Sequence, residues 1–244
     1  MIDPDRLVRL ARAVTPDPGV FVEAGANDGL RQSNTLRLEK EHGWSGLLIE
    51  PSPAAYAALG ENRPTAVHIN AALVSASFVG ESVRGAFSDG QLTGTLAPEL
   101  VSRASDVPRS IVQRVASKLR RVLRLKPKVT LVEVPALTLA ECLEESGITT
   151  LNLLSLDVEG YELEVLQGLN LDEVRPQMMI VEVRSVQAWD LLQWCYANDY
   201  WVVEKISNFS HESMSGWTGD HEDYVIVDRS VLRSNKKLRD ELGL

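Results

Sequence analysis

Several acidic residues in this sequence follow directly after runs of apolar residues that have the length of buried strands. Glu23, Glu50 and Asp157 each close such a run. Because the carboxyl ends of parallel strands meet at one edge of a sheet, carboxylates in these positions can gather around one ligand. They can accept hydrogen bonds from sugar hydroxyls, attract an ammonium group or take up a proton. We therefore expect a polar binding site at this edge.

The turn after the first run has the pattern Glu-x-Gly-x-x-x-Gly, formed by Glu23, Gly25 and Gly29. It departs from the Gly-x-Gly-x-x-Gly loop of dinucleotide-binding folds because Asn27 replaces the second glycine, which makes a pyrophosphate a less suitable ligand. Turn amides, with acids such as Glu23 and Asp28, can instead hold the carboxylate and ammonium of an amino acid. The alternative is that the glycines only turn the chain.

The second run ends at Glu50, about 20 to 25 residues after the glycine turn, where doubly wound sheets place the acid that binds ribose hydroxyls. A nucleoside next to an amino-acid group suits S-adenosylmethionine. The end of the third strand would lie over the nucleobase, so Asn70 and Ala71 are candidate adenine contacts. The predicted cofactor-binding residues are Glu23, Gly25, Ala26, Asn27, Asp28, Gly29, Asn34, Glu50, Pro51, Asn70, Ala71 and Asp157.

Asp157 and Glu159 are the predicted catalytic residues, since they follow the strand expected next to the cofactor strand. They could remove a proton from an acceptor hydroxyl, or hold a divalent ion that acidifies it. The candidate metal ligands are Asp157 and Glu182, and oxygen ligands alone favour Mg²⁺ over zinc. Asp157 and Glu159 could also only cap the following helix. His211 is a second candidate base, although a solvent-facing histidine is the simpler interpretation.

Alternating strand and helix patterns predict that these residues lie in one doubly wound α/β domain. A leading helix between Asp5 and Val14 and a helix capped by Ser33–Thr35 are expected. The predicted strands comprise residues 20–22, 46–49, 66–73, 129–134, 151–156, 178–181, 200–203 and 224–227. The expected organisation is an N-terminal helix (1–19), a domain (20–228) with a helical insert or cap at about 98–128, and a charged C-terminal tail (229–244).

Composition limits the class of protein. The 244 residues are 44% hydrophobic, enough for a sizeable core, and a net charge of −9 gives no general attraction to nucleic acid. No run reaches the roughly 18 apolar residues of a membrane span, and the N-terminus lacks the basic start of a leader. Cys142 and Cys195 form no zinc-binding pattern. We expect a soluble, cytoplasmic protein.

One basic segment is the exception to this acidic composition. Residues 98–128 carry nine of the 25 basic residues, from Arg103 to Lys128, against two acids, with apolar residues at helical spacing. An amphipathic basic helix of this kind could cap the active site, recognise an anionic substrate or dock peripherally on an anionic membrane. The sequence leaves these three alternatives open.

Four motifs in this order resemble the FkbM family of S-adenosylmethionine-dependent methyltransferases. They comprise Val22–Gly29, Ser33–Thr35, Ile49–Pro53, and Leu156–Glu162 with Val165–Gly168 after it. The resemblance implies a class I methyltransferase fold, with a seven-stranded, mostly parallel sheet whose last strand is antiparallel and with helices on both faces. It also implies O-methylation of a sugar, glycoconjugate or natural product.

The basic segment has no counterpart that the family resemblance explains, and Glu23 stands where many relatives have aspartate. A different interpretation is therefore a catalytically silent, methyltransferase-like module that docks on a membrane or partner through the basic helix. A nicotinamide enzyme is disfavoured by Asn27. The expected partner is a small-molecule or carbohydrate acceptor.

Overall fold

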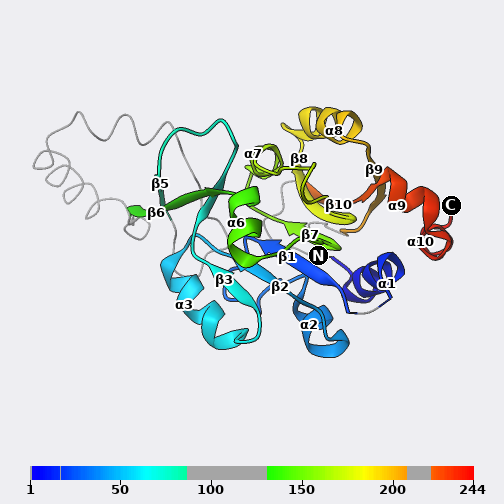
Figure 1. Cartoon of the computed structure of the whole chain (residues 1–244), viewed down its shortest axis with the longest axis horizontal. Helices are drawn as coiled ribbons and strands as arrows, with labels where there is room; N and C mark the ends of the chain where they lie inside the picture. The colour runs from blue at the N-terminus through cyan, green and yellow to red at the C-terminus, as the bar shows by residue number, and fades with distance from the viewer. Residues whose placement is uncertain (1, 17, 87–130, 208–220) are drawn as a thin grey trace, which may run out of the picture.

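The computed structural model describes residues 2–16, 18–86, 131–207 and 221–244. Its centre is a seven-stranded sheet in the order β3-β2-β1-β7-β8-β10-β9, in which only β10 runs antiparallel to its neighbours (Figure 1). The strands are β1 (Val20–Ala24), β2 (Ser45–Ile49), β3 (Val67–Ile69), β7 (Leu153–Leu156), β8 (Met178–Arg184), β9 (Tyr200–Lys205) and β10 (His221–Asp228). The predicted mostly parallel sheet with its last strand reversed is confirmed.

Alternation along the strands divides the core into two layers, since successive side chains point to opposite faces of a sheet. Val22 of β1 packs in one cluster with helices α6, α7 and α8, whereas Phe21 packs in the other with α1, α2 and α3. These helices are α1 (Pro4–Val14), α2 (Leu36–His42), α3 (Pro53–Asn62), α6 (Leu139–Ser146), α7 (Glu162–Gln167) and α8 (Ala188–Ala197). Helices thus cover both faces, as predicted.

The expected strand at residues 66–73 is wrong as a single element. The chain leaves the main sheet after β3 and enters a second, three-stranded sheet in the order β4-β6-β5. Its strands are β4 (Ala72–Val74), β5 (Ser82–Ala86) and β6 (Leu131–Thr138). The break lies at Asn70 and Ala71, because β3 pairs with β2 while β4 pairs with β6, and one straight strand cannot serve both partners.

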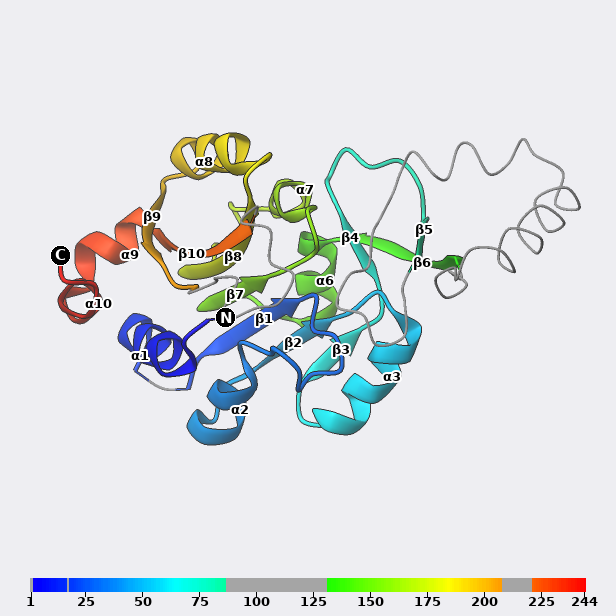
Figure 2. The same ribbon diagram turned by 180° about the vertical axis from the view of Figure 1, so that it is seen from behind.

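The predicted C-terminal tail is also wrong. The structure instead forms α9 (Arg229–Ser234) and α10 (Lys236–Leu242). Figure 2 shows both helices beside α1, at the end of the sheet remote from the small sheet. Leu238 is fully buried there, and the Arg6 guanidinium pairs with the Glu241 carboxylate at 2.6 Å. The many charged residues of this segment make its sequence look like a tail, but its apolar residues form one helical face that packs into the core.

The basic segment, residues 98–128, lies outside the described ranges, so its three interpretations stay predictions. Among the described helices, none is long and apolar enough to cross a membrane.

Candidate active site

The turn after β1 lies at the carboxyl edge of the sheet and is bound to the end of β2. The amides of Gly25 and Ala26 both donate to the carbonyl oxygen of Ile49, at 3.0 and 3.1 Å. Gly25 has a φ of +82°, and a Cβ there would lie 1.8 Å from the carbonyl oxygen of Asp157. Only glycine therefore lets this turn pass so close to the end of β7.

Glu50 joins the glycine turn to the segment after β2. Its carboxylate accepts hydrogen bonds from the amides of Asn27 and Ser52, both at 2.8 Å, and the residue is 8% exposed. Burial raises the pKa of Glu50, while the two amides oppose that shift. The Asn70 side chain holds the same segment by donating to the carbonyls of Glu50 (2.7 Å) and Pro51 (3.1 Å). A carboxylate has about four acceptor sites, so Glu50 retains capacity for ligand hydroxyls.

Two predicted cofactor contacts have other surroundings in the structure. Asp28 accepts hydrogen bonds from the amides of Leu30 (3.0 Å) and Arg31 (2.8 Å), and so stabilises the turn that follows. Ala71 is 0% exposed, because it lies where the chain passes from the main sheet to the small one. The structure leaves Ala71 no accessible surface for the predicted adenine contact.

Glu23, at the end of β1, is buried and binds the segment that precedes α2. Its carboxylate accepts hydrogen bonds from the Ser33 hydroxyl (2.8 Å), the Asn34 amide (2.7 Å) and the Thr35 hydroxyl (2.5 Å). The Asn34 side chain in turn donates to Ser155 on β7 at 2.9 Å. Burial raises the pKa of Glu23. Glu23 therefore positions the loop from within the protein, and its contact with a ligand stays a prediction.

Arg63 is a positioning residue that the sequence analysis missed. Its guanidinium is completely buried and donates to the Glu39 carboxylate at 2.6 Å and to the Gly29 carbonyl at 3.0 Å. It also donates to the hydroxyls of Ser33 (3.0 Å) and Thr35 (3.2 Å). This arginine thus supports the glycine turn and the segment that Glu23 holds. A single arginine at the end of a predicted helix carries no sequence signal for such a role.

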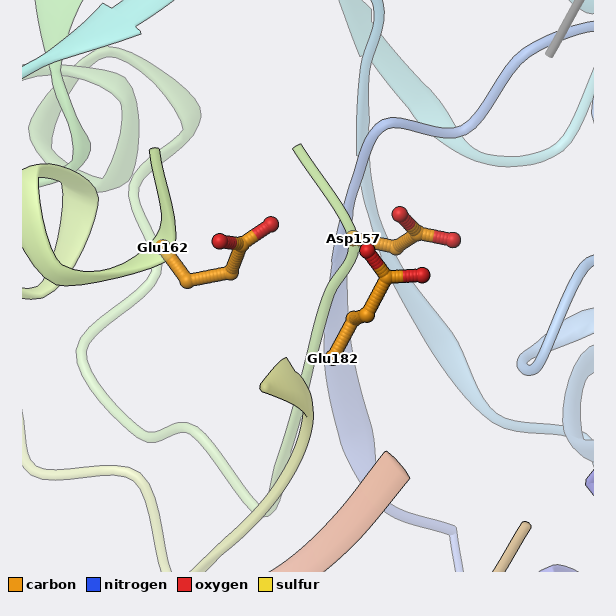
Figure 3. Close-up of side chains that lie close together, drawn as sticks. All are labelled: Asp157, Glu162 and Glu182. Carbon is orange, nitrogen blue, oxygen red and sulfur yellow. The ribbon is translucent and has the colours of Figure 1, made fainter. Parts of the chain in front are cut away.

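Asp157, Glu162 and Glu182 bring one carboxylate oxygen each to within 4.8 Å of one another (Figure 3). They come from the end of β7, the start of α7 and β8, respectively. One oxygen of Glu162 accepts from the amides of Val158 (3.1 Å) and Gly160 (3.0 Å). The structure confirms that Asp157 and Glu182 lie together, but the acid beside them is Glu162.

Glu159, predicted to act with Asp157, turns instead toward Arg184 and forms an ion pair with its guanidinium. The reason is the backbone: Glu159 has a φ of +59° and Gly160 one of +101°, so the chain reverses before α7 begins. A catalytic role for Glu159 stays a prediction. His211 lies outside the described residues.

The family of the chain follows from its sequence match. A model of the methyltransferase FkbM domain matches residues 23–202, which is more than half of the chain. The chain belongs to the FkbM methyltransferase family. The resemblance noted in the sequence is thereby confirmed. A search of curated proteins found no match.

Three solved methyltransferase structures illustrate the similarity, and each has low sequence identity to this FkbM-family protein. The ribosomal protein L11 methylase of Lactobacillus delbrueckii subsp. bulgaricus is 11% identical, with a TM-score of 0.41 and coverage of 92% of this chain and 76% of that one. TrmK of M. capricolum, in complex with S-adenosylhomocysteine, is 8% identical, with a TM-score of 0.47 and coverage of 92% and 67%. A TehB-like methyltransferase of Corynebacterium glutamicum is 12% identical, with a TM-score of 0.43 and coverage of 91% and 87%.

The likeness to these structures concerns the fold. The strand order described above, with β10 reversed between β8 and β9, gives the seven-stranded, mostly parallel sheet that the family resemblance implied, so the predicted fold is confirmed. Family and fold together support an S-adenosylmethionine-dependent methyltransferase.

The acids at this edge of the FkbM domain raise one another's pKa values. Asp157 is open to solvent, yet the surrounding protein desolvates its carboxylate, and this desolvation together with the charge of Glu182 raises its pKa well above the usual range. Burial raises the pKa of Glu182 to about 7 and that of Asp223, opposite it on β10, to about 6. The raised pKa makes the ionised carboxylate of Asp157 a stronger proton acceptor than an ordinary aspartate.

These shifts predict that the ligand-free protein loses stability as the pH rises from 5.5 to 8. Glu182 has a folded pKa of about 7 against an ordinary value of 4.5, so the native state binds more protons than the unfolded state between these values. The free energy of unfolding must then fall as the pH rises. We expect the melting temperature to drop by at least about 5 °C, since each kcal/mol corresponds to about 2–4 °C at this chain length.

Differential scanning calorimetry of wild type and Glu182→Gln measures this effect. Burial, Glu159 and Glu162 disfavour the ionised form of Glu182, whereas His221 and Arg184 favour it. Asp157 and Asp223 also face Glu182, from the end of β7 and from β10. Removal of the Glu182 charge should therefore flatten the profile. The groups with lowered pKa, such as Asp228, titrate below this window. A wild-type melting temperature that is constant or rises up to pH 8 contradicts the prediction.

Proposed function

We propose that this protein is an S-adenosylmethionine-dependent O-methyltransferase that acts on a hydroxyl of a sugar, glycoconjugate or natural product. The observation that carries the proposal is the meeting of Gly25, Glu50 and Asp157 at one edge of the sheet, in a chain of the FkbM family. The acidic net charge of −9 supports a small or carbohydrate acceptor over a nucleic acid.

The residues at this edge fit the methyl donor. Because Gly25 has no Cβ, the turn lies against the Asp157 carbonyl, and this packing fixes the turn at the carboxyl edge where a ligand would bind. The remaining acceptor sites of Glu50 suit the two ribose hydroxyls. Pro51 follows β2 and Asn70 follows β3, and the Asn70 side chain donates to the Pro51 carbonyl at 3.1 Å, so the two residues could contact the nucleobase together. When bound, S-adenosylmethionine supplies a methyl group activated by its sulfonium.

Asp157 is the residue of this chain that would receive the proton of the acceptor hydroxyl. An alcohol is a weak nucleophile, so removal of its proton is the help it needs most from the protein. Asp157 is open to solvent, its backbone lies against Gly25 of the turn, and its raised pKa makes its carboxylate a stronger proton acceptor. Asn34, held between Glu23 and Ser155, fixes the opposite wall of the turn.

A replacement of Glu50 tests the donor site. We expect Glu50→Gln to weaken binding of S-adenosylhomocysteine by about tenfold to 100-fold, because hydrogen bonds to a charged acceptor are worth about 1.5–3 kcal/mol. Isothermal titration calorimetry measures the change. Glu61→Gln, at an exposed position on α3, is the matched control. Equal affinity in wild type and Glu50→Gln contradicts the assignment.

Transfer of a labelled methyl group to a panel of sugars, glycoconjugates and phenolic or aliphatic alcohols tests the reaction. A methyl ether on an oxygen is the expected product. Binding of S-adenosylhomocysteine without transfer to any hydroxyl would favour the silent module that docks through residues 98–128.

A further inference from the structure

Asp157, Glu162 and Glu182 form a cluster of three carboxylates. Removal of a proton from the acceptor needs only one of them, so the other two require a separate explanation. The nearest oxygens of the three lie within 4.8 Å of one another although like charges repel. Figure 3 shows the Glu162 side chain reaching from α7 toward the other two. Each comes from a different element, so the fold itself, and not the local sequence, brings them together.

Two oxygens in this group are buried without a hydrogen-bond partner. Glu162 is 0% exposed, and while one of its oxygens accepts two backbone amides, the other, Oε2, accepts none. Oε1 of Glu182 is also buried and accepts no hydrogen bond, but it forms an ion pair with the Arg184 guanidinium at 3.3 Å. A buried carboxylate without enough partners costs several kcal/mol, so such an arrangement calls for a counter-charge.

The positively charged groups near this cluster are shared among several acids. Arg184 forms ion pairs with both Glu159 and Glu182. The imidazole of His221 lies 3.9 Å from Glu182. Glu159 and Asp223 add further negative charge around the group. One guanidinium and one imidazole therefore face five carboxylates in the described part of this edge.

We propose that Asp157, Glu162 and Glu182 bind a hard divalent cation such as Mg²⁺. Oxygen ligands alone select such ions over zinc. Oxygen ligands of one cation lie at most about 4.2 Å apart for Mg²⁺ and about 4.8 Å apart for Ca²⁺, so a group within 4.8 Å matches Ca²⁺ and would bind Mg²⁺ after a closure of about 0.6 Å or less. Three protein ligands leave coordination positions for water or for oxygens of an acceptor.

The site lies beside the glycine turn, since the backbone of Asp157 contacts Gly25. On the basis of the proposed function, the ion would bind the acceptor hydroxyl and lower its pKa. One oxygen of Asp157 would hold the ion, and the second would take the proton. Acceptors that offer two neighbouring oxygens, such as vicinal diols of sugars, would then bind best.

The test measures Mn²⁺ binding to the full chain by electron paramagnetic resonance, after removal of metals with a chelator and with no donor or acceptor present. We expect saturable binding of one Mn²⁺ per chain, displaced by Mg²⁺. Glu162→Gln and Glu182→Gln should each weaken it at least tenfold. Glutamine at 162 retains the carbonyl oxygen that accepts the two amides, so the turn should persist. Glu145→Gln, on the exposed face of α6, is the charge-matched control.

Absence of saturable Mn²⁺ binding in wild type, or unchanged affinity in both glutamine variants, overturns the proposal. Calorimetry with S-adenosylhomocysteine on the same samples separates this result from a failure of the proposed function. Donor-product binding without Mn²⁺ binding contradicts the metal site alone. Mn²⁺ binding without donor-product binding contradicts the methyltransferase activity and leaves the metal site in place.

Discussion

Gly25→Ala is expected to weaken binding of S-adenosylhomocysteine by at least about tenfold and to reduce methyl transfer by about 100-fold, the loss typical of a misplacement of about 1 Å. The added Cβ would lie 1.8 Å from the Asp157 carbonyl oxygen, and both atoms belong to backbone segments that anchor strands. The turn must therefore move away from β7, and its amides leave the positions set by Ile49. Calorimetry and the labelled-methyl assay measure the two effects.

Gly43→Ala separates this clash from backbone strain. Gly43 also has a left-handed backbone, with a φ of +68°, but nothing lies within 4 Å of the position of its Cβ. Both variants share the cost of a side chain at positive φ, about 1–2 kcal/mol. Only Gly25→Ala should weaken binding of S-adenosylhomocysteine. Equal affinities for the two variants would show that close packing against Asp157 does not matter for binding.

Arg63→Met should lower the free energy of unfolding by about 3–5 kcal/mol, as removal of one partner from a buried ion pair typically does. Arg63 is completely buried and forms an ion pair with Glu39. Its Nη1 also lies 4.0 Å from Oε2 of Glu23. Methionine fills a similar volume, so the loss reports the charge and the hydrogen bonds rather than a cavity. Urea denaturation followed by circular dichroism measures it.

Arg37→Met is the matched control, since Arg37 forms its ion pairs with Asp5 and Glu41 at the surface. Surface pairs contribute little, so this change should leave stability nearly unaltered. Adding Glu39→Gln to Arg63→Met should restore part of the loss by removing an uncompensated charge. A destabilisation by Arg63→Met no larger than that of Arg37→Met would rule out a supporting role for the buried network.

Local patterns are sufficient to predict much of the sheet and the glycine turn after β1. Apolar runs that end in Glu23, Glu50 and Asp157 predict strands whose ends meet, and the structure places Glu50 and Asp157 on either side of the Gly25 turn. Such patterns are readable because strand periodicity, glycine turns and strand-end acids depend on residues close in sequence. The partner of each strand is harder to predict. Residues 66–73 have the pattern of one strand, but the chain breaks at Asn70 and Ala71 because β3 pairs with β2 and β4 pairs with β6.

Apolar runs, glycines and motif order thus determine, without any coordinates, that this chain is a class I methyltransferase of the FkbM family, and they predict a glycine turn at residues 23–29. Only the tertiary structure shows that Glu162 is the third acid beside Asp157 and Glu182. The chain reverses at Glu159, so the Glu159 side chain pairs with Arg184 and Glu162 lies beside Glu182. Arg63 gained its role in the same way, from contacts with Gly29 and Glu39. Such contacts join residues far apart in the chain, and no local pattern encodes them.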